Sequence, residues 1–95
     1  MTLTSRQRAE LRSRAHHLDP AVQVGQQGVT PALVQSLDDV LRARELVKVQ
    51  IGRNTGLDVR EIANSLAAAA SADIVQVIGR TFTLWRENPD LRAPR

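Results

Sequence analysis

The sequence predicts a two-layer α/β sandwich with the element order α-β-α-β-α-β-β, in which a four-stranded mixed sheet carries its helices on one face. Three segments repeat apolar residues at helical spacing, and the shorter segments between them alternate apolar and polar residues. Glycine or proline breaks separate the two patterns. The 95 residues suffice for one domain, which we expect over residues 1–86, followed by a polar tail over 87–95.

The first helix is expected over residues 5–17, behind a capping box formed by Thr4 and Gln7. The chain has 13 Lys and Arg against 10 Asp and Glu, a formal charge of +3, and residues 1–16 carry four arginines against one glutamate. The excess positive charge therefore lies in this helix. Arg8 and Arg12 share a stripe without an acidic residue, so we expect them to be exposed, unpaired and able to contact phosphate, with solubilising surface charge as the alternative.

A short strand over residues 21–24 and a second helix over 31–44 flank the Gly-x-x-Gly segment at 25–28. Thr30, which is followed by proline, is a typical helix start. A Gly-x-x-Gly segment in this place turns the chain sharply and exposes N–H groups beside a helix N-terminus, where the helix dipole favours phosphate. We expect a side chain at Gly28 to crowd the approach of that phosphate. A purely structural turn is the alternative reading of these four residues.

Alternation predicts a strand over residues 46–51, and Asp58 begins a third helix that runs to about residue 71. Residues 74–86 are expected to form a hairpin that turns at Gly79 and Arg80. The buried stripe of the third helix is predicted to be Val59, Ile62, Leu66 and Ala69. With the helices on one sheet face, the other is a polar sheet face that carries Gln23, Lys48, Gln50, Thr81, Thr83 and Trp85.

The sequence lacks the residues that several classes of protein function require. The chain has no cysteine, so it has neither a disulfide nor a thiolate metal site, and the adjacent His16 and His17 point about 100° apart on a helix. The longest apolar run, Leu66–Ala70, is far below the roughly 20 residues of a membrane span, and residues 1–30 show no secretory signal. No nucleophile and base or phosphate-binding fingerprint is recognisable. We therefore expect a cytoplasmic protein that is not an enzyme and uses no metal, cofactor or small-molecule substrate.

Three segments of the chain carry a family resemblance. They read LRSRAHHLDPAVQVGQQGVT over residues 11–30, LRARELVKVQI over 41–51 and ADIVQVIGRTFTLWR over 72–86. In this order and at this spacing the sequence resembles the small bacterial YhbY-like proteins, the stand-alone form of the CRM domain (chloroplast RNA splicing and ribosome maturation). The resemblance implies a fold similar to the C-terminal domain of bacterial translation initiation factor three, RNA binding through a loop like that of KH domains, and association with precursors of the large ribosomal subunit.

Carried over to this chain, the resemblance places an RNA-binding loop and a set of basic partners. They are Gly25, Gln26, Gln27 and Gly28 in the loop, with Arg44, Lys48, Arg80 and Arg86 around it. The loop departs from the family, which usually has a cation between the glycines, so backbone clamping is expected to survive while direct charge is lost. Trp85 stands where the family commonly has tyrosine and keeps a flat ring for base stacking, with the sealing of a sheet edge as the alternative.

Together these features predict a monomeric RNA-binding protein that acts in assembly of the large ribosomal subunit, with ribosomal RNA of the subunit precursors as its partner. The alternative is an adaptor that docks on a ribosomal protein through the polar sheet face. The two differ in salt dependence, because phosphate contacts release counterions whereas a protein interface responds weakly to salt.

Overall fold

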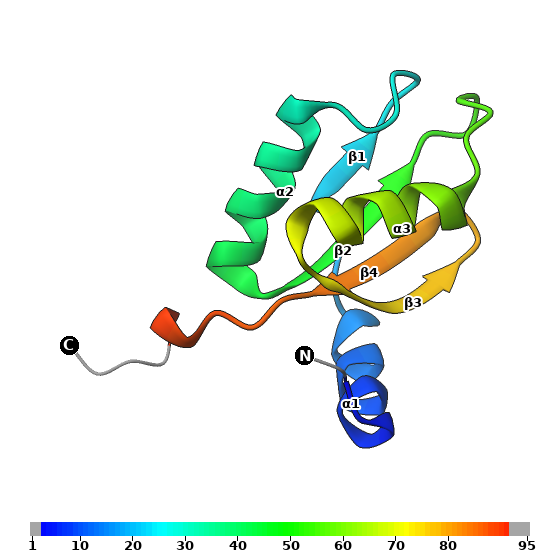
Figure 1. The fold of residues 1–95 in the computed structure, drawn as a ribbon. Coiled ribbons are helices and arrows are strands. Elements are labelled where there is room, and N and C mark those ends of the chain that lie inside the picture. Colours follow the sequence, from blue (N-terminus) through cyan, green and yellow to red (C-terminus); the bar gives the residue numbers. More distant parts are fainter. Residues whose placement is uncertain (1–2, 92–95) are drawn as a thin grey trace.

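The structure, a computed structural model, describes residues 3–91 and confirms the predicted order of elements (Figure 1). The helices are α1 (Ser5–Ala15), α2 (Pro31–Arg44) and α3 (Val59–Ala70); the strands are β1 (Val22–Val24), β2 (Leu46–Ile51), β3 (Asp73–Ile78) and β4 (Thr81–Trp85), and a 3₁₀ turn, η1 (Pro89–Leu91), follows them. Helix α1 ends two residues earlier than predicted. The amides of His17 and Leu18 bond the carbonyls three residues before them, at 3.3 and 3.1 Å, and this tighter turn closes the helix.

Each helix begins at the cap that the sequence indicates. The Gln7 amide donates to Thr4 Oγ1 at 3.1 Å, and the Thr4 amide donates to Gln7 Oε1 at 2.9 Å, so the predicted capping box is confirmed. Asp58 Oδ1 accepts from the amides of Arg60 and Glu61 at 2.9 and 3.1 Å. These local bonds satisfy amide groups that the first helical turn leaves without partners.

The sheet has the strand order β1-β2-β4-β3, with β1 parallel to β2 and the other pairs antiparallel, so the predicted mixed sheet is confirmed. Its register aligns side chains in rows across the strands. One row on the polar sheet face contains Gln23, Gln50, Thr81 and Ile78, and the next contains Lys48, Thr83 and Gln76. Residues that pair directly across strands project from the same face, so each row is a line of neighbouring side chains.

Helices α2 and α3 cover the other sheet face and form the main core with it. The largest fully buried side chains there are Leu37, Leu41, Ile51, Leu66, Phe82 and Leu84. In α3 the prediction that Ala69 is buried is wrong. Ile62, Leu66 and Ala70, which are spaced four residues apart, lie on the side of the helix that faces the sheet, and Ala69 is exposed. The predicted sandwich is thus confirmed for these two helices.

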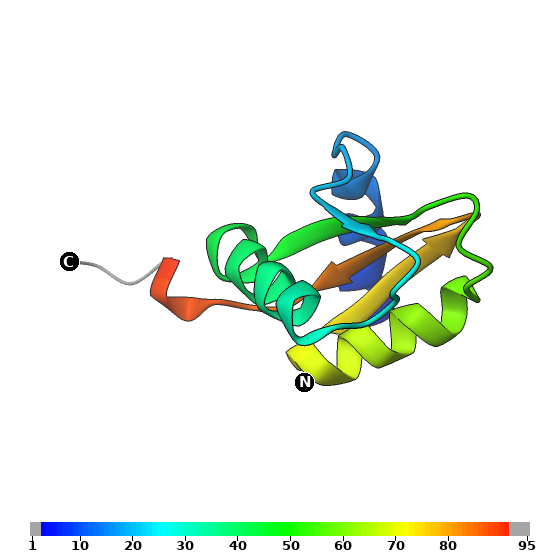
Figure 2. The ribbon, with the colours of Figure 1, turned by 90° about the horizontal axis from the view of Figure 1, so that it is seen from above.

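Helix α1 packs on the opposite sheet face, so the prediction that the helices share one face is wrong for α1 (Figure 2). Leu46 and Trp85 pair across β2 and β4, and together with Val75 they belong to a second, smaller core. This cluster lies at one end of the polar sheet face and would meet water if nothing covered it. Its cover consists of Leu3, Leu11 and Ala15.

The segment after β4 is attached to the domain through Asn88. Its amide donates to the Glu45 carboxylate at 2.6 Å, and its side chain donates to the Arg42 carbonyl at 2.7 Å. Residues 87–91 were predicted as part of a solvated tail; most of their side chains are exposed, but this contact holds the segment against the end of α2. Residues 92–95 of the predicted tail lie outside the described residues.

Replacing Leu11 by alanine should loosen α1 from the sheet, because Leu11 is 5% exposed and packs in the cluster around Trp85. We expect the free energy of unfolding to fall by about 2–3 kcal/mol. Trp85 is the single tryptophan of the chain, so its fluorescence should move to longer wavelength as water reaches the ring. The control is Arg12→Ala on the exposed side of the same helix. Parent-like emission and stability in Leu11→Ala would contradict the packing of α1 on this face.

Candidate nucleic-acid interface

The Gly-x-x-Gly segment forms an exposed turn at the start of α2. The Gly28 amide donates to the Gly25 carbonyl at 3.0 Å, and Gln26 and Gln27 are exposed at the tip. Within residues 3–91 the amide N–H groups of these two glutamines make no hydrogen bond. Thr30 caps α2 by accepting from the Leu33 amide at 3.1 Å. Free amide donors therefore lie beside a helix N-terminus, an arrangement that suits an anion.

The two glycines of the turn have different roles. Gly28 is buried and has a φ of +69°, and a Cβ placed on it would lie 3.8 and 3.9 Å from side-chain carbons of Leu57 and Ile62. The expectation that a side chain at Gly28 would crowd an approaching phosphate is therefore wrong, because that side chain would point towards the core. A Cβ on Gly25 meets nothing within 4 Å, and the φ of Gly25 is not positive. The open surface of the turn is at Gly25.

A second loop, residues 52–57, lies beside the turn (Figure 1). The Gly52 amide donates to the Val24 carbonyl at 3.0 Å and joins the two segments where β1 and β2 end. Arg53, at the exposed tip of this loop, makes no hydrogen bond or ion pair within the described residues. Sequence reasoning missed Arg53, although it follows a strand that ends in a glycine-bounded segment. The loop that carries this unbonded cation thus starts next to the strand that leads into a turn with no cation of its own.

Two of the predicted RNA-contacting arginines are bonded inside the fold. Arg80 donates to the Gly52 carbonyl at 2.6 Å and to Thr55 Oγ1 at 3.1 Å, and so holds the second loop. Arg86 donates to the Ala70 carbonyl at 2.7 Å and forms an ion pair with Asp38 at 2.8 Å. A guanidinium group in this position neutralises the carbonyl end of α3. A role of either residue in RNA binding stays a prediction.

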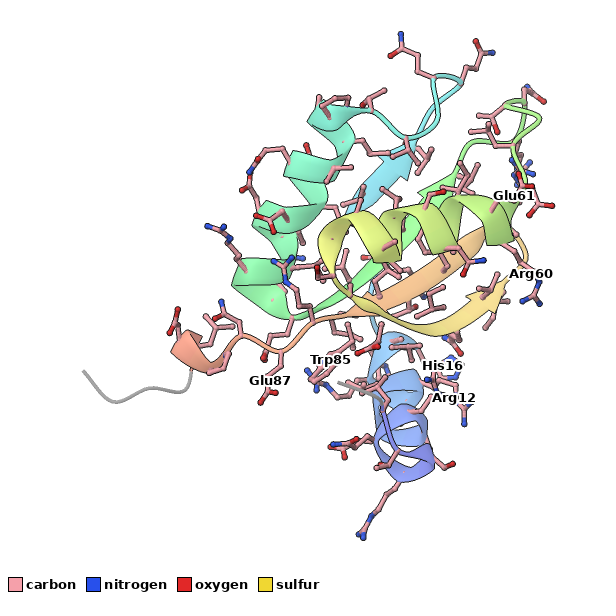
Figure 3. All side chains as sticks on the ribbon, viewed as in Figure 1. Arg12, His16, Arg60, Glu61, Trp85 and Glu87 are labelled. Atoms are coloured by element: carbon pink, nitrogen blue, oxygen red, sulfur yellow. The ribbon has the colours of Figure 1, made fainter. Side chains whose placement is uncertain are left out.

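Arg8 is also bonded internally, and the expectation that it is exposed and unpaired is wrong. It is half-buried and donates to the carbonyl of Ile74, with a longer contact of 3.4 Å to that of Val75. The register between β3 and β4 shifts at this point, and the guanidinium group meets the carbonyls of this irregular stretch. Arg12 is exposed and has no partner among the described residues, as predicted. Figure 3 shows Arg12 and His16 on one side of α1 and Trp85 on the other.

The remaining predicted residues lie apart from the turn. Arg44 is exposed in the last turn of α2 and lines a hollow of about 320 Å³ that Arg14 and His17 also line. Lys48 is half-buried in the middle of the polar sheet face. The Trp85 ring packs against α1 on the face of the sheet. Strand β4 lies between β2 and β3, so the ring does not seal a sheet edge, and base stacking by Trp85 stays a prediction.

Within residues 3–91, no three or more His, Cys, Asp or Glu side chains gather in a way that could hold a metal ion. None of the three helices combines the length and apolar character that a bilayer crossing requires.

These features define a small α/β module with an exposed Gly-x-x-Gly turn in front of a helix. The family model for the CRS1/YhbY (CRM) domain matches residues 3–86. The chain therefore belongs to this family, and the resemblance seen in its three motifs is confirmed.

Relatives of similar length support the assignment. "Probable RNA-binding protein YqeI" of Bacillus subtilis is 39% identical over 88 residues, which cover 93% of this chain and 92% of the relative. "Probable RNA-binding protein PA4753" of Pseudomonas aeruginosa is 34% identical over 89 residues, with coverages of 94% and 86%. The solution structure of SAV1595 from Staphylococcus aureus matches with a TM-score of 0.78 at 39% identity, over 92% of this chain and 91% of that one.

The two glycines should respond differently to alanine. Gly28→Ala should lower the free energy of unfolding by about 1–2 kcal/mol, because alanine is strained at a φ of +69°. Gly25→Ala should stay within about 0.5 kcal/mol of the parent, because the added methyl group meets no neighbour. Denaturant unfolding of the two variants checks both values, and equal losses would contradict the different backbone geometry of the two positions.

Proposed function

We propose that this protein is a non-enzymatic RNA-binding module that clamps the phosphate backbone at its Gly-x-x-Gly turn. The observation that carries the proposal is the pair of unbonded amide groups at Gln26 and Gln27, exposed next to the N-terminus of α2. Backbone N–H groups and helix N-termini are common phosphate contacts in protein complexes with nucleic acids. The names of the relatives from two bacteria, both of which describe RNA-binding proteins, support the same function.

The second loop supplies charge that the turn lacks. The hollow at the turn, of about 530 Å³, is lined only by uncharged residues, among them Gln23, Gln26 and Gln27. Arg53 directly follows Gly52, whose amide bonds the Val24 carbonyl just before the turn, and its side chain is exposed. We propose that its guanidinium group reaches the phosphate held at the turn. A phosphate would then accept from the amides of the turn and from the guanidinium group together, and charge-assisted bonds of this kind are stronger than neutral ones.

The particular RNA partner and the cellular compartment are proposed from the family resemblance of the sequence. We propose ribosomal RNA in precursors of the large subunit as the partner and the cytoplasm as the compartment. The adaptor alternative requires a polar sheet face that is open to a protein surface. Helix α1 covers only one end of this face, so the salt dependence of binding decides between RNA and the adaptor.

RNA affinity measured over a range of salt concentrations tests the proposal. Gly25→Asp and Gly25→Asn place side chains of nearly equal size in the open space of the turn, and only aspartate adds negative charge. We expect Gly25→Asp to bind RNA about tenfold more weakly than Gly25→Asn, which corresponds to a lost contact of about 1.4 kcal/mol. Thermal melting controls for folding. Equal affinities for the two variants, or an RNA affinity of the parent that does not depend on salt, would favour the adaptor.

A positive charge in the Gly-x-x-Gly turn should be able to replace the positive charge of Arg53 in RNA binding. Arg53→Gln should weaken RNA binding, and adding Gln26→Lys to it should restore the affinity, because both side chains can serve the same phosphate. Gln26→Lys alone should make the slope of log affinity against log salt steeper by about 0.7. Asn64→Lys adds the same charge on the exposed side of α3 and is the control. If Asn64→Lys restores binding as well as Gln26→Lys does, the effect is one of net charge and not of the turn.

A further inference from the structure

A further hollow lies on the polar sheet face, in the part that α1 leaves uncovered. Its volume is about 320 Å³, at the lower end of the range of small-ligand pockets. Lys48, Thr83 and Gln76 form one row of its floor, and the segment that follows α1 forms its wall with His16 and Asp19. We call this feature the sheet hollow.

Thr83, in the middle of this floor, has an unsatisfied hydroxyl group. The residue is 1% exposed, and its Oγ1 finds no hydrogen-bond partner within residues 3–91. A buried hydroxyl group without a partner is unfavourable and uncommon in native proteins. Its neighbours in the row, Lys48 and Gln76, carry further donors and an acceptor at the same level. The sheet hollow therefore offers hydrogen bonds that the protein itself does not use.

The chemistry of the lining selects a neutral polar ring over an anion. Lys48 is the only Lys or Arg in the lining, and the carboxylate of Asp19 would repel a phosphate. Ile78, a residue that is 58% exposed, and Leu18 offer apolar surface at the edge. Hydrogen-bonding groups on the floor and apolar contacts at the side suit an unstacked nucleobase, which presents polar edges and a flat apolar face.

We infer that the sheet hollow binds one unpaired base of the RNA strand that the Gly-x-x-Gly turn holds, with the Thr83 hydroxyl group bonded to the base edge. The inference rests on the proposed function. A row of side chains connects the two places: Gln23 lines the hollow at the turn, its neighbour in the row is Gln50, and Thr81 and Ile78 line the sheet hollow. Neighbouring strands lie about 4.8 Å apart, so this row is about 14 Å long. An RNA strand can cross it along the protein surface.

Two substitutions of Thr83 separate the hydroxyl group from the shape of the side chain. Thr83→Val replaces the hydroxyl group by a methyl group, and Thr83→Ser keeps the hydroxyl group and removes the methyl group. Because the hydroxyl group is unpaired in the free protein, Thr83→Val should melt at the temperature of the parent or a few degrees higher. Thr83→Ser should melt lower because it loses buried apolar volume.

The RNA affinities of the two variants should follow the opposite order to their melting temperatures, with Thr83→Ser binding more tightly than Thr83→Val. The probes are homopolymers of uridine, cytidine and adenosine, and we expect the parent to bind one of them most tightly. Thr83→Val should lower the affinity for that homopolymer by about three- to tenfold and reduce the differences among the three, whereas Thr83→Ser should keep them. The salt dependence should stay that of the parent in both variants, because the phosphate contacts at the turn are unchanged.

The outcomes separate the inference from the proposed function. A parent that binds no RNA contradicts both. A parent that binds all three homopolymers equally, or a Thr83→Val variant that keeps the preference of the parent, contradicts only the base site and leaves a protein side chain as the occupant of the sheet hollow. A Thr83→Val variant that melts well below the parent shows that the hydroxyl group already has a partner, which also overturns the inference.

Discussion

The parallel pairing of β1 with β2 is the constraint on which the candidate RNA surface depends. Parallel strands end at the same edge of a sheet, so the segments that follow them must leave the sheet together. The bond from the Gly52 amide to the Val24 carbonyl joins these segments, and Arg80 holds the second one from the hairpin. An uncharged turn with free amide groups and a loop with a free arginine therefore become neighbours. Neither segment has by itself both features that a phosphate site needs.

The arginines of the chain divide into those that the fold uses and those that it leaves free. Arg8, Arg80 and Arg86 each donate to main-chain carbonyl groups at irregular places, namely a register shift, a loop and a helix end. The guanidinium group suits these places because it carries several donors in a fixed plane. Arg12 and Arg53 remain exposed and unbonded within the described residues. The net charge includes the internally bonded arginines and the exposed ones alike, so it does not show which surface can bind an anion.

The position of α1 gives the polar sheet face two different ends. At one end, Leu46, Val75 and Trp85 need cover, and α1 supplies it. At the other end the face stays open, and the segment that leaves α1 forms a wall around the row of Lys48, Thr83 and Gln76. One helix and the segment after it thereby stabilise the sheet and shape a hollow in which a buried hydroxyl group has no partner among residues 3–91. The sheet hollow and the turn are connected by a row of polar side chains, so the two can serve one extended ligand.

The sequence by itself determined the elements, their order and the place of the turn, because caps, alternation and glycine breaks act over a few residues. Thr4, Thr30 and Asp58 begin their helices as predicted, and the three family motifs located the Gly-x-x-Gly segment. Only the tertiary structure decided which sheet face α1 covers, that a side chain at Gly28 would point inwards, and that the loop after β2 leaves the sheet beside the strand that leads into the turn. These features depend on contacts between distant parts of the chain, such as that of Arg8 with Ile74, 66 positions away. Local periodicity carries no information about such pairs, since they form only when the tertiary fold brings a side chain of one segment to the main chain of another.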